Sequence, residues 1–479
     1  MLFNSFQFFL FFPLVTIAYF TLPHRYRWML LLAASCCFYM AFIPVYILIL
    51  FFTITVDYVA GIAIEDAQGT RRKTFLIASI AANVGVLAFF KYFNFLNANL
   101  AGLAAVLHWN YPMAMLDILL PIGLSFHTFQ SLAYTIEVYR GKFKAERHLG
   151  IFALYVMFYP QLVAGPIERP QNLLPQFHTQ HTFEYRRVTD GLKLMAWGFF
   201  KKLVIADRLA ILVNQVYAHP GDYQGLALIV ATIAFAFQIY CDFSGYSDIA
   251  IGAAQVMGIR LMKNFDRAYF SQSISEFWRR WHISLSTWFR DYLYIPLGGN
   301  RAGAARWQLN LFVTFLVSGL WHGANWTFVA WGALHGFYFL LAIWAAPVRD
   351  RFVRTIGLTR VPWLHQLVQM TVTFALVAFA WIFFRAETIA DALYIATHLL
   401  SGLSPTGLFD LGLSRLEFGI AVAALVVLFG VEFLQRHGSL RERLARQPVW
   451  VRWAAYYALV MSILLLGNFT QQTFIYFQF

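Results

Sequence analysis

The longest stretch of the sequence without a charged side chain lies between Arg306 and Arg349. It contains 42 residues, none of which is Asp, Glu, Lys or Arg. Because a helical residue advances about 1.5 Å and a hydrocarbon core is about 30 Å thick, this stretch is long enough to cross a bilayer twice. Two histidines, His322 and His335, nevertheless lie within it. Any fold of this chain must therefore bury a membrane-length apolar run and account for imidazole inside it.

Composition extends this constraint to the whole chain. Of the 479 residues, 60% are apolar and only 12% are charged, which is typical of a polytopic membrane protein surrounded by lipid. The net charge of +13 comes from Lys and Arg in short connections between apolar runs. This pattern is a topology signal, and we expect no nucleic-acid partner.

The apolar runs predict an all-α helical bundle of about 11 transmembrane helices, with some interfacial and re-entrant helices. A first span is expected near the N-terminus, because no basic residue or cleavage site marks a signal peptide there. The sequence shows no internal repeat and no long polar linker, so we expect one membrane-embedded domain over residues 1–479. The other candidate spans are 28–43, 45–64, 74–93, 118–138, 149–165, 190–206, 224–257, 308–346, 366–385, 417–434 and 453–470.

Three basic clusters in the first third of the chain predict its orientation. Successive clusters are separated by two candidate spans, so all three are expected on one face. The bias of Lys and Arg toward the cytoplasm makes that face cytoplasmic and places the N-terminus outside. The clusters are Arg25/Arg27, Arg71/Arg72/Lys73 and Arg140/Lys142/Lys144/Arg147.

Two carboxylates interrupt the apolar run "QIYCDFSGYSDIAIG", residues 238–252. A carboxylate at membrane depth costs a few kcal/mol unless it is paired or hydrated, so Asp242 and Asp248 need an explanation. One interpretation is that they pin helices through hydrogen bonds to nearby hydroxyls or to Arg. The other is that they line a polar cavity, which is also what a proton or solute transporter requires.

The segment "SEFWRRWHISLSTWFRDYLYIPLGGN", residues 275–300, predicts an amphipathic helix lying in the membrane interface. Charged and hydroxyl side chains occupy most of one face, and His282 lies at the border beside the tryptophans. The apolar face consists of Phe277, Trp278, Trp281, Leu285, Trp288 and Phe289.

In "GLWHGANWTFVAWGALHG", residues 319–336, His322 follows Trp321 between two glycines that loosen a helix. From Trp307 to Leu320 there are about 14 residues, or roughly 21 Å of helix, too short to cross the hydrocarbon core. A break at the glycines would place His322 inside the membrane, where irregular backbone must be buried in protein or line a cavity.

The pair His178 and His181 has a spacing that metal ligands also use. No Cys or carboxylate cluster lies nearby, so we expect a polar loop and no metal site.

These blocks together resemble the membrane-bound O-acyltransferases, most closely the bacterial branch that serves alginate O-acetylation. The resemblance implies that His322 is the residue most closely tied to catalysis and that His282 is the second family histidine. His127 departs from the pattern, where an aromatic residue such as Tyr is expected. The matching blocks are "SFHTFQSLAYTIEVYRG" (125–141), "YPQLVAGPIERP" (159–170), "FQIYCDFSGYSDIAIG" (237–252), "FWRRWHISLSTWFRDYLYIPLGGNR" (277–301) and "GLWHGANWTFVAWGALHG" (319–336).

The family's chemistry suits these residues. Acyl transfer from a thioester to an alcohol needs a base, and imidazole, with a free pKa near 6.5, is mostly neutral at pH 7. His322 is the expected general base, and His282 is expected to orient it or a substrate. Asn325 either donates a hydrogen bond to the developing oxyanion or bonds backbone carbonyls at the break. Trp278, Trp281 and Trp321 are expected cavity-lining residues, together with Asp242 and Asp248.

The resemblance also implies the donor and the partners. The donor is expected to be acetyl-CoA or another acyl thioester, used as a substrate, with no permanently bound cofactor. An extracytoplasmic acyl-handling protein would complete transfer to an exported polysaccharide, with alginate favoured, and the chain would lie in the bacterial inner membrane. The alternatives are a D-alanyl transfer protein of teichoic acid synthesis and, in another class, a proton or solute transporter.

Overall fold

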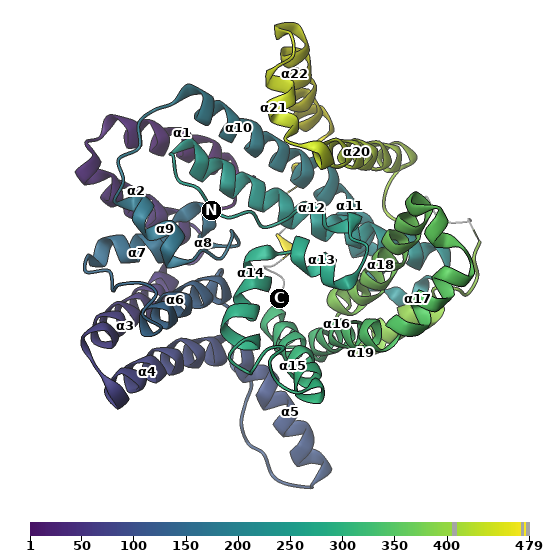
Figure 1. The fold of residues 1–479 in the computed structure, drawn as a ribbon, viewed down its shortest axis with the longest axis horizontal. Helices are drawn as coiled ribbons and strands as arrows, with labels where there is room; N and C mark the ends of the chain where they lie inside the picture. Colours follow the sequence, from purple (N-terminus) through teal and green to yellow (C-terminus); the bar gives the residue numbers. More distant parts are fainter. Residues whose placement is uncertain (405–409, 471–473, 476–479) are drawn as a thin grey trace. The chain divides into compact units, whose positions relative to one another are not determined.

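Every regular element that the computed structural model describes, in residues 1–404, 410–470 and 474–475, is helical (Figure 1). This confirms the all-α fold class. The chain forms two compact units, here called unit 1 (residues 1–195 and 249–262) and unit 2 (residues 196–248 and 263–479). The helices α10 and α12 carry the chain from one unit to the other. The organisation of 1–479 as one domain stays a prediction.

Unit 1 is built mainly from the first third of the chain. Its elements are α1 (Phe6–Thr21), α2 (His24–Met40), η1 (Pro44–Tyr46), α3 (Ile47–Asp66), α4 (Gly69–Leu87), η2 (Ala88–Tyr92), α5 (Phe93–Val106), α6 (Leu124–Tyr139), α7 (Leu149–Met157), α8 (Tyr159–Leu162), α9 (Pro170–Phe177) and most of α10 (Tyr185–Phe199).

A buried carboxylate joins α3, α4 and α6, which lie side by side (Figure 1). Asp57 on α3 is fully buried and accepts hydrogen bonds from Ser79 Oγ at 2.6 Å and from Asn83 Nδ2 at 2.8 Å, both on α4. Ser79 also donates to Thr135 on α6 at 3.3 Å. A charge buried among apolar helices is tolerated only when it is hydrogen-bonded, so this cluster fixes the register of the three helices.

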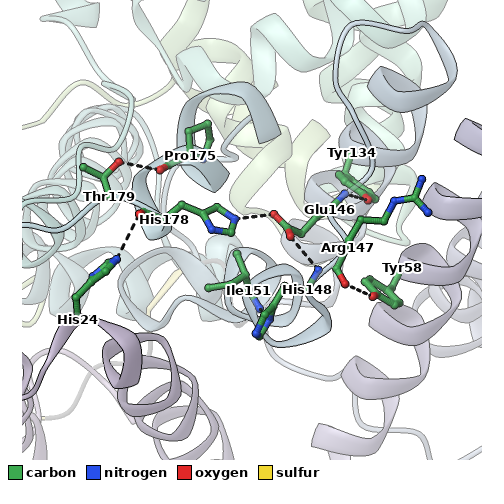
Figure 2. A network of polar contacts seen from close by, with 10 residues as sticks. All are labelled: His24, Tyr58, Tyr134, Glu146, Arg147, His148, Ile151, Pro175, His178 and Thr179. Atoms are coloured by element: carbon green, nitrogen blue, oxygen red, sulfur yellow. Dashed lines mark hydrogen bonds and ion pairs between the residues drawn. The ribbon is translucent and has the colours of Figure 1, made fainter.

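Residues beside the first and third basic clusters belong to one polar network within unit 1 (Figure 2). His178 Nε2 lies 2.8 Å from Glu146 Oε2, and His24 Nε2 lies 3.3 Å from the carbonyl oxygen of His178. Arg147 pairs with Glu65 and with Asp66 at the end of α3. These contacts link the surroundings of the first and third clusters, and the placement of all three clusters on one membrane face stays a prediction. The identity of that face stays a prediction.

Unit 2 contains the helices that follow α10. Its elements are η3 (Phe200–Ala206), α11 (Asp207–Ala218), η4 (Pro220–Asp222), most of α12 (Leu226–Val256), η5 (Ala268–Phe270), α13 (Ile274–Arg280), α14 (Ile283–Phe289), η6 (Arg290–Tyr294), α15 (Ala304–His322), α16 (Trp326–Trp344), α17 (Ala346–Thr355), η7 (Leu358–Arg360), α18 (Pro362–Arg385), α19 (Ile389–His398), α20 (Arg415–Leu434), η8 (Gln435–His437), α21 (Leu440–Ala445) and α22 (Val449–Leu466).

Glycines bring α15 and α16 into close contact. A Cβ atom added to Gly332 would lie 2.5 Å from the carbonyl oxygen of Phe315 and 3.2 Å from the Cα of Gly319. Backbone therefore packs against backbone, an arrangement that small residues allow between membrane helices. The two helices form a tight hairpin in unit 2 (Figure 1).

The chain is a multi-pass membrane protein. Among the described residues, seven helices are long and apolar enough to cross a membrane, and Phe6–Thr21 is a shorter apolar helix. Several other predicted spans fall on shorter helices, such as α6 and α7, which lie within unit 1. The seven candidate spans are Pro44–Asp66, Gly69–Val106, Leu226–Val256, Trp326–Trp344, Pro362–Arg385, Arg415–Leu434 and Val449–Leu466.

Candidate active site

His322 is the last residue of α15, and the helix ends there because of the glycine that follows. Gly323 has extended backbone, and a Cβ atom at this position would collide with the ring of Phe328. The chain then runs without helix to Trp326, where α16 begins. The predicted break is therefore confirmed at Gly323, whereas Gly319 lies within the helix.

Aromatic rings enclose the His322 side chain, which is 5% exposed. Its ring centroid lies 4.9 Å from that of Trp321, 4.9 Å from that of Trp331 and 5.3 Å from that of Phe384. All three rings meet the imidazole at steep angles of 71–86°. Such an enclosure keeps bulk water away from the imidazole.

Helix α15 is longer than the 14 residues counted from Trp307 to Leu320, although it is not among the seven candidate spans. The helix begins at Ala304 and has 19 residues, so it is about 28 Å long, close to the thickness of a hydrocarbon core. Counting from Trp307 missed a first turn that contains Arg306. The depth of His322 in the membrane stays a prediction, while its burial within unit 2 does not depend on helix length.

The prediction of one continuous amphipathic helix within residues 275–300 is wrong. The chain forms two short helices, α13 and α14, and His282 lies between them with φ 42° and ψ 56°. This left-handed backbone conformation is uncommon for a residue other than glycine and often marks a functional site. The predicted apolar face is correct, because all six of its residues are buried.

His282 is buried within unit 2 instead of lying at the border of a surface helix. Its side chain is 0% exposed, and the edge of its ring meets Phe243 at a centroid distance of 4.6 Å. His282 lies outside the seven candidate spans, and burial lowers its pKa to about 3. The imidazole is therefore neutral at physiological pH.

Trp321 contacts both predicted histidines. Its ring centroid lies 4.9 Å from that of His322 and 6.2 Å from that of His282. Trp281, next to His282, is 1% exposed and packs against Trp381 on α18 at 5.1 Å. The structure thus brings the two histidine blocks together around Trp321.

A third histidine, His335 on α16, belongs to the same cluster and was absent from the predicted site. Its Nδ1 accepts a hydrogen bond from Trp278 Nε1 at 3.2 Å, and its side chain is fully buried. Trp331 lies one helical turn earlier. Its ring centroid is 5.0 Å from that of His335 and 4.9 Å from that of His322. The spacing of Trp331 and His335, four residues apart in one apolar run, is the signal that would have indicated a shared face.

A cavity of about 760 Å³ opens beside this cluster within unit 2. It lies among α13, α14, η6, α15 and α16, and its lining is mostly apolar, with several hydroxyls and two arginines, Arg279 and Arg290. The lining includes the predicted Trp278 and also Ser318, which is one turn before His322 on α15. Neither His322 nor His282 lines the cavity. Trp278 and Ser318 each precede one of these histidines by four residues in the sequence.

Asn325 does not occupy the predicted oxyanion position. It caps α16, where its Oδ1 accepts a hydrogen bond from the backbone N–H of Thr327 at 3.1 Å. Its Nδ2 donates to the carbonyl oxygen of Glu387 at 2.9 Å. The chain between His322 and Asn325 is not helical, so the two do not share a helical face. The amide bonds backbone, as the alternative expected, but the carbonyl that it binds belongs to Glu387, just after α18, and not to the break.

Asp242 and Asp248 form ion pairs with lysines, which the sequence analysis did not predict as their partners. Asp242 lies 2.7 Å from Lys202 Nζ, and Asp248 lies 2.8 Å from Lys201 Nζ. Lys202 also lies 2.8 Å from Asp207. These ion pairs favour the interpretation that the carboxylates pin helices, with lysines in place of the expected hydroxyls or Arg. Neither carboxylate lines the cavity beside the histidines.

The second oxygen of Asp242 binds the C-terminal segment. Asp242 Oδ2 accepts a hydrogen bond from the backbone N–H of Ile475 at 2.9 Å. The neighbouring Phe474 is 2% exposed and packs against Tyr246 at 4.8 Å and against Phe243 at 6.0 Å. Phe243 is the ring that meets His282, so this end of the chain lies near the histidine cluster.

The other singled-out histidines lie in unit 1. His178 pairs with Glu146, whereas His181 bonds the carbonyl oxygen of Gln176 at 3.0 Å, so the predicted polar loop is confirmed. His127 on α6 is 1% exposed, and neither of its ring nitrogens has a hydrogen-bond partner in the described part of the chain. Within that part, no three His, Cys, Asp or Glu side chains are grouped to hold a metal ion.

Comparison with known proteins identifies the family. The model of the membrane-bound O-acyltransferase family matches residues 147–386, which include both histidine blocks. The chain belongs to this family. It is an O-acyltransferase. The roles of His322 and His282 in the reaction stay predictions.

Three relatives show the range of named activities. A probable alginate O-acetylase AlgI of Pseudomonas putida is 39% identical over the full length of both chains. A peptidoglycan O-acetyltransferase of Helicobacter pylori is 33% identical over 87% of this chain and 83% of its own length. A teichoic acid D-alanyltransferase of Streptococcus thermophilus is 31% identical over 45% of this chain and 55% of its own length.

Proposed function

We propose that this O-acyltransferase moves an acetyl group from a cytoplasmic thioester donor across the membrane for O-acetylation of an exported polysaccharide. The observation that carries the proposal is the enclosure of His322 by Trp321, Trp331 and Phe384. Alginate is the leading acceptor, because the full-length similarity is to a protein named as a probable alginate O-acetylase. The proposed location is the bacterial inner membrane, with the N-terminus outside.

In the proposed reaction, His322 removes the proton from an acceptor hydroxyl as its oxygen attacks the thioester carbonyl. The tetrahedral intermediate then collapses, the C–S bond breaks, and the proton passes to the leaving thiolate. The products are an acetyl ester and a free thiol. Because water would compete as the nucleophile, the apolar rings around His322 favour transfer over hydrolysis.

We assign the acyl donor to the cavity among α13, α14, α15 and α16. A volume of about 760 Å³ lies in the range of small-molecule sites, and a mostly apolar lining suits the arm of an acyl thioester. Arg279 and Arg290 line the same cavity and supply positive charge for donor phosphates. Ser318 places the inner wall one helical turn from His322.

The donor assignment is tested by filling the cavity. Thr314 lines it on α15, so Thr314→Trp is expected to raise the KM for acetyl-CoA at least about tenfold, with a smaller effect on kcat. Leu309 on the same helix is 54% exposed, and Leu309→Trp is the matched control. Equal KM values in the two variants would contradict the assignment.

His282 is proposed to position His322 through Trp321, which contacts both rings. His282→Ala is therefore expected to slow transfer at saturating donor by at least about tenfold, or roughly 1.4 kcal/mol of barrier. Transfer at the wild-type rate would leave His282 with a packing role only.

A separate extracytoplasmic protein is proposed to complete transfer to the polymer. The test is reconstitution in liposomes with acetyl-CoA inside and alginate outside, with and without the partner. We expect slow donor turnover by this chain alone and rapid polymer acetylation only with the partner. Rapid acetylation without the partner would overturn this relay, and acetylation of peptidoglycan in place of alginate would change the acceptor.

The transporter alternative receives less support from the same geometry. Asp242 and Asp248, which would form an ion path, are each paired with a lysine. Flux of protons or solute in donor-free liposomes, abolished by Asp242→Asn, would favour it over acyl transfer.

A further inference from the structure

A cleft at the start of α10 lies within unit 1 and shares no lining residue with the cavity beside the histidine cluster. It has a volume of about 520 Å³ and is lined by the first turns of α10, the end of α12 and the loop that follows α12. The lining residues are Glu184, Arg186, Arg187, Asp190, Ile251, Gln255, Gly258, Ile259, Arg260 and Leu261.

The loop that forms one wall of this cleft is held by its backbone. The N–H of Arg260 donates to Gln176 Oε1 at 2.8 Å, and Gln176 Nε2 donates to the carbonyl oxygen of Arg260 at 2.9 Å. Gly258 has φ +92°, and a Cβ atom there would lie 2.8 Å from the side chain of His181. The wall is therefore preformed, while the Arg260 side chain extends outward.

The cleft contains more basic than acidic side chains. Glu184 lies 3.5 Å from Arg187, and Asp190 lies 3.2 Å from Lys193, so both carboxylates have cationic partners. Arg186 and Arg260 are exposed and form no ion pair with any described residue. The cleft thus presents two arginines that can bind one anionic group, with the amide of Gln255 as a further hydrogen-bonding group.

The surroundings of the cleft are those of a membrane surface. Phe183 and Tyr185, which flank Glu184, are 60% and 76% exposed, and Leu192 on α10 is 46% exposed. Exposed aromatic rings beside arginines on an amphipathic helix are typical of a segment that lies in the headgroup region of a bilayer. A soluble anion would use the arginines but would leave these apolar side chains exposed.

We propose that this cleft binds the phosphate of an anionic membrane phospholipid, held by Arg186 and Arg260, with its acyl chains against the apolar side of α10. Basic pockets beside membrane helices bind anionic headgroups in this way. The inference does not depend on the proposed acetyl transfer.

The test uses the full-length purified protein in detergent and native mass spectrometry, with phosphatidylglycerol and phosphatidylcholine as probes. Wild-type protein is expected to retain phosphatidylglycerol in preference to phosphatidylcholine. Arg186→Gln/Arg260→Gln is expected to lose this preference by roughly tenfold or more. The matched control is Arg71→Gln/Lys73→Gln, which removes the same charge from the start of α4 in unit 1 and is expected to behave like wild type.

Two results would overturn the proposal. If both double variants lose the preference equally, the attraction is a general effect of charge and the cleft is not a site. If millimolar inorganic phosphate displaces phosphatidylglycerol when sodium chloride of the same ionic strength does not, the cleft binds soluble anions. An unchanged elution volume and thermal midpoint of the variants establishes that they are folded.

Discussion

Gly332 carries no functional group, yet Gly332→Ala is expected to disable the enzyme. The added Cβ would lie 2.5 Å from the carbonyl oxygen of Phe315, about 0.9 Å short of the 3.4 Å at which ordinary contact begins. The obstructing atoms are backbone atoms of α15, so no side-chain rotation relieves the clash. The helices α15 and α16 must separate.

The separation acts directly on the site. Trp331 precedes Gly332 on α16 and lies 4.9 Å from His322 on α15, so moving the helices apart by about 0.9 Å displaces one ring relative to the other. Overpacking of this kind costs about 1–3 kcal/mol of stability. A misplacement of about 1 Å in a catalytic group costs on the order of a hundredfold in rate.

The assay is polymer O-acetylation in cells, normalised to the amount of protein in the membrane, with the thermal midpoint in detergent as a second readout. Gly430 on α20 is the matched control, because a Cβ atom there meets nothing within 4 Å. Gly430→Ala should leave both readouts unchanged. If Gly332→Ala behaves like Gly430→Ala, the close packing of α15 on α16 does not position His322.

Lys202→Met should lower the free energy of unfolding by about 3–5 kcal/mol, because Asp207 and Asp242 then lose their shared buried cation. Lys193→Met, which breaks a half-exposed pair, should cost about 0–1 kcal/mol; equal thermal midpoints for the two variants would contradict this. Burial raises the pKa of the Glu168 carboxyl from 4.5 to about 7. The stabilisation that the neutral carboxyl gives the folded state is therefore fully present below pH 4.5 and is lost as the pH rises through 7. Glu168→Gln should therefore flatten the fall in thermal midpoint between pH 5 and pH 8, and an unchanged slope would show that Glu168 is not its source.

The break that presents His322 was predictable because its cause is local. Gly323 follows the histidine in the sequence, and a side chain there would collide with Phe328, only five residues away. A glycine at the end of an apolar run indicates such a stop without knowledge of the rest of the fold. The length of α15 was predicted less well, because a helix continues through Arg306 at a membrane surface without any change in backbone geometry.

The break at His282 was not predictable from the helical wheel. The apolar residues of α13 and α14 keep the same periodicity on both sides of the break, and His282 has no glycine beside it. Its left-handed backbone is held by the surrounding packing, including the ring of Phe243 from α12. A tertiary cause of this kind leaves no signal in the local pattern.

The partners of the buried carboxylates were missed for a different reason. Lys201 and Lys202 lie about 40 residues before Asp242 and Asp248, and a single sequence does not state which of them meet. A partial signal was present, because two lysines interrupt one apolar run and two aspartates interrupt the next. Mutual neutralisation is the least costly arrangement for such charges.

If His322 is the base of the transfer reaction, replacing this one side chain should stop the transfer. The measurement is the acetyl content of exported polymer in cells producing His322→Gln, compared with wild type at equal protein in the membrane. Gln keeps a hydrogen-bonding side chain of similar size but cannot accept the proton. We expect the His322→Gln protein to insert into the membrane and accumulate there while the polymer stays unacetylated. Polymer acetylated to the wild-type level would show that His322 is not the base.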